Sequence, residues 1–167
     1  MLYILRVLCF IFVSLLAACT SMEEDEREQE ALQMAEEFIE LHYTVSDYQE
    51  MDKMEYSLEL LEKMEPYVTE AELTKLKKER EEMYPLDLAK RLKYNIHVEQ
   101  VDFQTTTETN HGQTLELSFE LGLNFSDHPS KPDQSLDMKG EMTFEDWNGE
   151  WKISRYWVQE IDPNDLE

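Results

Sequence analysis

The segment LELSFELGLNF, residues 115–125, decides the fold that we expect for this chain. Apolar side chains occupy alternate positions along it, and polar residues lie between most of them. Alternation with a period of two places the two sets on opposite faces of a β-strand. We therefore predict a strand with one buried face, formed by Leu115, Leu117, Phe119, Leu121, Leu123 and Phe125.

The preceding residues form a second strand that pairs with this one as a hairpin. Its apolar positions change parity between Val98 and Val101, so one β-bulge near Gln100 is needed to keep them on one face. We expect a three-residue turn at 110–112. The predicted pairs are Phe103 with Phe119, Val101 with Leu121 and Thr109 with Gln113.

A second hairpin closes the chain in the stretch FEDWNGEWKISRYWVQE, residues 144–160. Asn148 and Gly149 favour a type I′ turn, because both residues tolerate a positive φ. A further bulge after Ile153 is needed, since the apolar parity shifts there. The predicted pairs are Phe144 with Ile153, Asp146 with Trp151 and Met142 with Tyr156.

Upstream of the strands, from about residue 24 to residue 94, apolar residues recur at helical spacing. One face of a first helix carries Ala31, Met34, Ala35, Phe38, His42 and Val45. Ser46 and Asp47 then predict a break and a new N-cap. The stripe of a second helix, ending before Pro66, is Tyr48, Met51, Met54, Leu58, Leu61 and Met64.

A third helix begins at a capping box, Thr69 to Glu72, in which the Glu72 side chain would reach back to the cap. This helix is expected to run to Pro85, and a short helical segment follows over residues 86–92. The sequence therefore predicts an α+β fold. N-terminal helices pack on a curved, bulged antiparallel sheet of at least four strands, in a cone-like arrangement.

We expect the start of the chain to be an export signal. Its uncharged, mostly apolar run, Val7–Ala18, is shorter than the roughly 20 residues that a membrane-spanning helix needs. The run ends in Leu16-Ala17-Ala18-Cys19, which resembles the lipobox of bacterial lipoproteins. That resemblance implies cleavage between Ala18 and Cys19, with diacylglycerol and N-acyl lipid on Cys19. The alternative is an uncleaved N-terminal anchor.

Charge and length limit what the exported part can do. Cleavage leaves 167 minus 18, or 149 residues, and loss of Arg6 changes the formal net charge from −23 to −24. Such a chain would be repelled by nucleic acid, and it is too short for a two-lobed solute-binding protein. We expect a signal peptide at 1–18, an acidic stalk at 19–30, one domain at 31–161 and a tail at 162–167.

The domain resembles the nuclear-transport-factor-like (cystatin-like, SnoaL-like) family. The resemblance rests on VSDYQEM at 45–51, on the curved meander, and on the closing hairpin with Asn148-Gly149 followed by Trp151-Lys152-Ile153. The family includes both enzymes and non-catalytic domains. The long helical segment before the sheet, residues 73–94, departs from the compact enzymes and favours a non-catalytic role.

Candidate residues for a pocket are His42, Tyr43 and Tyr156, with Asp47 as a further acid that more simply caps a helix. None forms a recognisable catalytic dyad, so we expect no catalytic residues. No cysteine remains free in a lipidated chain, so a Cys–His nucleophile is excluded. We expect no metal site and no cofactor other than the lipid, since the spacing of the histidines is not that of metal ligands: His42, His97, His111 and His128.

These observations predict a lipoprotein on the outer face of the cytoplasmic membrane, or on the outer membrane if the cell has one. It would act as a binding or accessory module for an envelope or membrane protein. We expect the loop at 126–135 to be an ordinary strand connection, and the alternative is a loop that contacts the partner. The alternative function is a small cone-fold enzyme, isomerase-like or hydrolase-like, with a buried acid/base residue.

Overall fold

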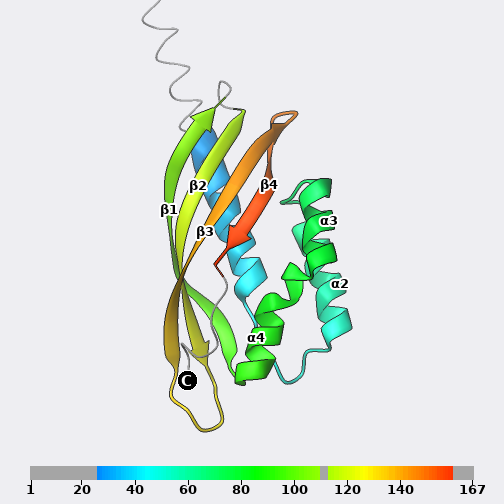
Figure 1. Cartoon of the computed structure of the whole chain (residues 1–167), viewed down its shortest axis with the longest axis vertical. Helices are drawn as coiled ribbons and strands as arrows, with labels where there is room; N and C mark the ends of the chain where they lie inside the picture. The colour runs from blue at the N-terminus through cyan, green and yellow to red at the C-terminus, as the bar shows by residue number, and fades with distance from the viewer. Residues whose placement is uncertain (1–25, 110–112, 160–167) are drawn as a thin grey trace, which may run out of the picture.

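The computed structural model describes residues 26–109 and 113–159. Its helices precede a four-stranded antiparallel sheet with strand order β1-β2-β3-β4 (Figure 1). The predicted α+β fold is confirmed. A helix over residues 26–43 comes first. The remaining elements are α2 (Lys53–Met64), α3 (Glu70–Glu79), the 3-10 helix η1 (Glu81–Met83), α4 (Tyr84–Leu92), β1 (Asn95–Thr109), β2 (Thr114–Ser126), β3 (Gln134–Trp147) and β4 (Glu150–Val158).

The first hairpin has the predicted register over its central part. Val101 pairs with Leu121, Phe103 pairs with Phe119, and the register shifts between Val98 and Gln100, where the bulge was expected. The pairing of Thr109 was wrong, because a second shift between Thr105 and Thr107 moves its partner to Thr114. The predicted turn at 110–112 lies outside the described residues.

The closing hairpin confirms all three predicted pairs and the bulge, which lies opposite the step from Thr143 to Phe144. Asn148 and Gly149 both have a positive φ, 60° and 94°. A type I′ turn requires this pair of angles, and its twist matches that of the flanking strands. The turn therefore sets the register up to the pair Phe144 with Ile153, and the bulge then places Tyr156 opposite Met142.

The prediction for the second helix was partly wrong. The helix, α2, has its N-cap at Asp52 and not at Asp47. The Asp52 side chain accepts hydrogen bonds from two backbone N–H groups. Met54 and Leu58, assigned to its buried stripe, are 75% and 63% exposed, and the buried residues are Leu60 and Met64. The apolar residues of this helix occupy more than one face, so periodicity alone did not identify the buried one.

The third helix begins at the predicted N-cap but ends early. The predicted return contact of the capping box was wrong, because the Glu72 carboxylate accepts from the Tyr156 N–H and the Thr69 N–H donates to the Ile153 carbonyl. Thr69 caps it by accepting from the Glu72 N–H at 3.3 Å. The helix stops at Arg80, which has a left-handed φ of 61°, instead of continuing to Pro85. Pro85 lies in the first turn of α4, where its missing N–H breaks no helical hydrogen bond. Because α3 ends at Glu79 and α4 begins at Tyr84, the short helix η1 lies between them in the chain.

The first helix overlaps the predicted acidic stalk, which is a correction to that boundary. Residues 26–30 are helical, and Arg27 lies 4.5 Å above the Trp151 ring and 2.9 Å from the Asp146 carboxylate. The Arg27 carbonyl also accepts a hydrogen bond from Trp151 Nε1. The signal peptide, Cys19 and the rest of the stalk lie outside the described residues. No helix in the described ranges combines the length and apolar character needed to cross a bilayer.

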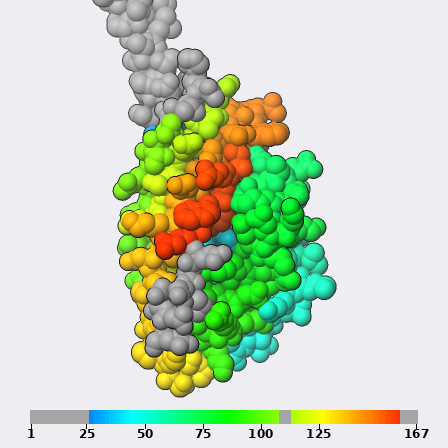
Figure 2. Space-filling view, viewed as in Figure 1, coloured from blue at the N-terminus to red at the C-terminus, as the bar shows by residue number. Residues whose placement is uncertain are grey.

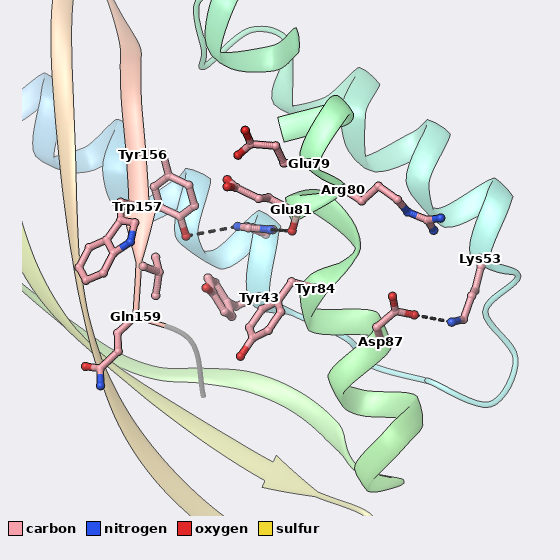
Figure 3. A pocket seen from close by; sticks show the side chains of 12 residues that line it. Tyr43, Lys53, Glu79, Arg80, Glu81, Tyr84, Asp87, Tyr156, Trp157 and Gln159 are labelled. Atoms are coloured by element: carbon pink, nitrogen blue, oxygen red, sulfur yellow. Dashed lines mark hydrogen bonds and ion pairs between the residues drawn. The ribbon is translucent and has the colours of Figure 1, made fainter. Parts of the chain in front are cut away.

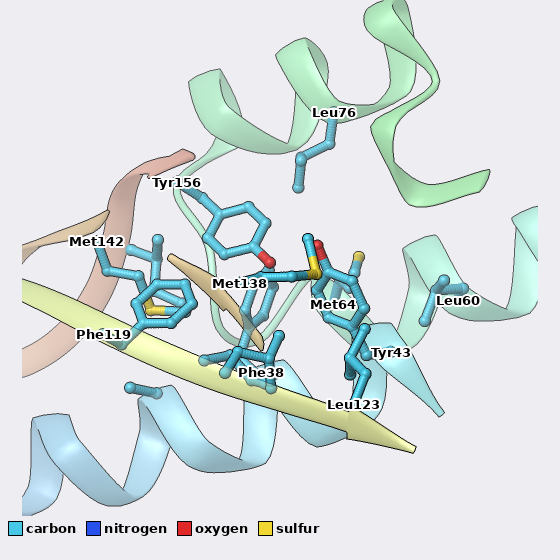
Figure 4. Close-up of a cluster of buried hydrophobic side chains, with 14 of the residues drawn as sticks. Phe38, Tyr43, Leu60, Met64, Leu76, Phe119, Leu123, Met138, Met142 and Tyr156 are labelled. Atoms are coloured by element: carbon cyan, nitrogen blue, oxygen red, sulfur yellow. The ribbon is translucent and has the colours of Figure 1, made fainter. Parts of the chain in front are cut away.

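The core fills the space between the sheet and the helices (Figure 4). Phe38, from the first helix, meets the edge of the Tyr156 ring at a centroid distance of 5.1 Å. Tyr156 also stacks nearly parallel on Phe119, at 6.4 Å. Other buried members of this cluster are Tyr43, Leu60, Met64, Leu76, Leu123, Met138 and Met142. The centre of the cone is therefore packed with side chains.

Candidate functional site

A cleft of about 830 Å³ lies between the C-terminal half of β4 and the helices that face it (Figure 3). Figure 2 shows the hollow between the red β4 and the green helical segments, with part of the first helix visible at its floor. We call it the β4 cleft. Its lining residues are His42, Tyr43, Lys53, Glu79, Arg80, Glu81, Tyr84, Asp87, Tyr156, Trp157, Val158 and Gln159.

His42 lies at the floor of the β4 cleft, on the first helix, and is only 2% exposed. Its Nε2 atom is 3.1 Å from the backbone carbonyl of Glu81, and its Nδ1 atom is 3.3 Å from the Tyr156 hydroxyl. A carbonyl can only accept, so Nε2 must carry the proton and donate it. Nδ1 then accepts from the Tyr156 O–H, and both ring nitrogens are occupied.

Burial keeps this network uncharged. It lowers the pKa of His42 to about 4, and the hydrogen bond to the Glu81 carbonyl opposes the shift only in part. Burial is also the main cause that raises the pKa of Tyr156 well above its usual value. The pKa of Tyr43 is raised for the same reason. All three side chains are neutral near pH 7.

The structure brings together the three residues that we predicted for a pocket, His42, Tyr43 and Tyr156. The His42 ring lies 4.8 Å from that of Tyr43 and 5.6 Å from that of Tyr156. Asp47 lies elsewhere and accepts from the N–H groups of Gln49 and Glu50, so it stabilises a turn and caps no helix. His42, Tyr43 and Tyr156 therefore form the aromatic floor of the β4 cleft.

No group of His, Cys, Asp or Glu side chains within the described ranges is arranged to hold a metal ion. His128, for example, accepts hydrogen bonds at Nδ1 from the N–H groups of Ser130 and Lys131. It thereby organises the loop after β2. His111 lies outside the described residues.

Sequence reasoning missed the charged wall of the β4 cleft. Glu79 and Glu81 were expected in the middle of one long helix, but the left-handed residue Arg80 ends that helix and directs both toward β4. Burial raises the pKa of the Glu81 carboxyl, and Glu79 adds to this, while Lys75 opposes it. Lys53 and Asp87 form an ion pair on the same side. No local pattern in the sequence predicts the break at Arg80.

No protein-family model matches this chain, and no curated protein matches it. Among solved structures, it is similar to an IcmL-like type IV secretion system protein from Legionella pneumophila. The TM-score is 0.54 at 15% identity, and the match covers 82% of this chain and 94% of the other. The two proteins share a fold.

Weaker matches have TM-scores below 0.5. They include a periplasmic fragment of TraM, at 0.47 with 12% identity, covering 80% of this chain and 98% of that one. Another is described as an Ntf2-like protein involved in plasmid conjugation, at 0.46 with 11% identity, covering 81% of this chain and 51% of that one. At these identities and scores, no activity or partner transfers to this chain.

Proposed function

We propose that this protein is an extracytoplasmic, lipid-anchored module that binds a protein partner of the cell envelope in the β4 cleft. The observation that carries the proposal is the combination of an open, charged cleft with a floor whose titratable groups are already engaged. Such a surface can recognise a partner through shape, charge and aromatic contact. The lipobox ending at Cys19 supports the anchor.

The state of His42 supports recognition over proton transfer. A general base needs a free lone pair and a pKa near the working pH. The Nδ1 lone pair of His42 faces the Tyr156 hydroxyl, and burial lowers the pKa of His42 to about 4. Residues held in this way make a rigid floor. The IcmL-like protein is described as a type IV secretion system protein, which is compatible with an accessory role for this fold in an envelope.

The test is site-specific photo-crosslinking in intact cells. A photoreactive residue replaces Gln159, an exposed residue that lines the β4 cleft. The control replaces Glu36, an exposed residue of the first helix. We expect one envelope protein to be captured from position 159 and not from position 36, and to bind the purified chain saturably. Equal capture from both positions, or no capture at position 159, would refute the proposal.

One observation favours the enzyme alternative: a buried histidine and two tyrosines lie at the floor of a cleft whose volume suits a small ligand. An isomerase or hydrolase could use such groups as oxyanion donors. Purified chain would be assayed with enolisable ketones and activated esters. Turnover that disappears in His42→Gln, with the fold retained, would favour the enzyme over the binding module.

A further inference from the structure

β4 is an edge strand, and the chain itself covers its free edge at Ile153 and at Tyr156. The strand order leaves the side of β4 away from β3 without a neighbouring strand. At Ile153, the N–H donates to the Tyr67 carbonyl at 2.8 Å, and the carbonyl accepts from the Thr69 N–H at 2.9 Å. The segment around Val68 therefore occupies the place of a fifth strand at this point.

Two side chains of α3 cover the next position of the edge. The Tyr156 N–H donates to the Glu72 carboxylate at 3.1 Å, and the Tyr156 carbonyl accepts from Lys75 Nζ at 3.1 Å. Glu72 and Lys75 thus supply the acceptor and the donor that a neighbouring strand would provide. Where side chains occupy the backbone groups of a strand edge in this way, the edge does not pair with another chain.

The edge is open one step further along, at Val158. The Gln159 N–H donates to the Lys139 carbonyl at 2.8 Å and so points toward β3. Peptide groups alternate in direction along a strand, so the N–H and C=O of Val158 point away from β3. Within residues 26–109 and 113–159, no hydrogen bond occupies either group. Val158 lines the β4 cleft, which lies on that side of the strand.

The wall opposite this open edge carries one more acid than base, with Glu79, Glu81 and Asp87 against Lys53 and Arg80. Lys75 Nζ lies 3.2 Å from the Glu72 carboxylate and 3.5 Å from the Glu81 carboxylate. Its single positive charge is therefore shared between two carboxylates. Glu79 lines the same wall, and its repulsion with Glu81 contributes to the raised pKa of the Glu81 carboxyl. An additional cation placed here would relieve that repulsion.

We propose that an extended segment of the protein partner pairs with β4 at Val158 and places a lysine or arginine side chain against Glu79 and Glu81. This inference rests on the proposed function and specifies how the β4 cleft is used. Backbone hydrogen bonds to an exposed strand edge supply affinity, and side-chain pockets supply specificity. Trp157, which is 51% exposed, lies next to the open edge and offers an aromatic contact to the added strand.

The charge pattern favours a partner over the chain's own C-terminal segment. Residues 160–167 follow Gln159 directly and contain four acidic residues and no basic one: Glu160, Asp162, Asp165 and Glu167. Their charge has the same sign as Glu79 and Glu81. A basic segment also complements the whole chain, whose formal net charge is −23.

The experiment selects nine-residue peptides from a random displayed library with the full chain held in lipid nanodiscs. We expect enriched peptides to contain lysine or arginine among β-forming residues. Val158→Pro removes one N–H from the open edge without removing a β3 hydrogen bond, and should weaken binding about two- to tenfold. Val158→Ala keeps the N–H and is the matched control, with an expected change below about twofold.

A second pair of variants tests the charge. Glu79→Gln combined with Glu81→Gln should weaken binding about two- to fivefold at low salt and reduce its salt dependence, whereas Glu62→Gln on exposed α2 should not. Hydrogen exchange at the Val158 amide provides a readout in the unmodified chain, where bound peptide should slow exchange about tenfold or more. This readout remains decisive if Val158→Pro fails to fold.

Several results would overturn the inference: no enriched peptide, enrichment of acidic peptides, or unchanged exchange at the Val158 amide with peptide bound. Binding that appears only after deletion of residues 160–167 would assign the edge to the chain's own C-terminal segment. If position 159 still captures its partner in Val158→Pro cells as efficiently as before, the binding function stands and edge pairing is refuted. If position 159 captures nothing, the proposed function itself fails.

Discussion

Substitution of Glu72 by alanine should destabilise the fold and expose one specific backbone amide. Glu72 is buried, although it is an acid in the first turn of a surface helix. Its Oε1 atom accepts from the Tyr156 N–H at 3.1 Å and from Lys75 Nζ at 3.2 Å. Alanine removes both contacts and leaves the Tyr156 N–H without its acceptor.

The two contacts set the size of the effect. A hydrogen bond to a charged acceptor contributes about 1.5–3 kcal/mol, and an unpaired buried donor costs a similar amount. The Lys75 side chain is 36% exposed, so its ion pair with Glu72 adds less than about 1 kcal/mol. We expect Glu72→Ala to reduce the free energy of unfolding by about 2–3 kcal/mol. Glu72→Gln keeps one acceptor and should cost about 1 kcal/mol.

Urea unfolding of the purified chain measures the loss, and native-state hydrogen exchange locates it. The Tyr156 amide should exchange much faster in Glu72→Ala, while amides in the first hairpin change only with global stability. Glu70→Ala is the matched control, because Glu70 is an exposed acid in the same helical turn. A loss below about 0.5 kcal/mol, or unchanged exchange at Tyr156, would refute the reasoning.

Three further predictions follow from single sites. Burial lowers the pKa of His42 to about 4, against about 6.5 in an unfolded chain. Between pH 4 and pH 7 the unfolded state therefore binds more protons than the folded state, and about 3 kcal/mol of stability is lost as the pH falls from 7 to 4. Urea titrations of His42→Gln should lack this loss, and an identical pH slope would contradict it. At Gly140, an added Cβ would lie 2.3 Å from the Phe119 ring, so Gly140→Ala should cost about 3 kcal/mol in urea unfolding. Gly122→Ala meets a flexible side chain at 3.1 Å and should cost less than about 1 kcal/mol; equal losses would count against this packing. Cys19→Ala should eliminate the acylated species in intact-protein mass spectrometry, and an unchanged, uncleaved, membrane-held chain would indicate a transmembrane anchor instead.

Local patterns predicted the sheet well and the helical layer less well. The pairs Phe103 with Phe119 and Phe144 with Ile153 follow from side-chain alternation and turn chemistry, which are properties of neighbouring residues. The buried face of α2 cannot be predicted from local patterns, because apolar residues lie on more than one side of that helix. Leu58 was expected in the core and is exposed, since only the packing of α2 decides which face is covered.

The sequence by itself determined the α+β order, the central register of the first hairpin, the register of the closing hairpin and the turn at Asn148-Gly149, because alternation and positive-φ preferences act over a few residues. Only the tertiary structure decided what surrounds the β4 cleft. Glu72 reaches Tyr156 across 84 positions of the chain, and the break at Arg80 turns Glu81 toward them. Such contacts form because a buried backbone group needs a hydrogen-bond partner, and here that partner comes from a distant segment. A short stretch of sequence does not show which distant residue supplies it.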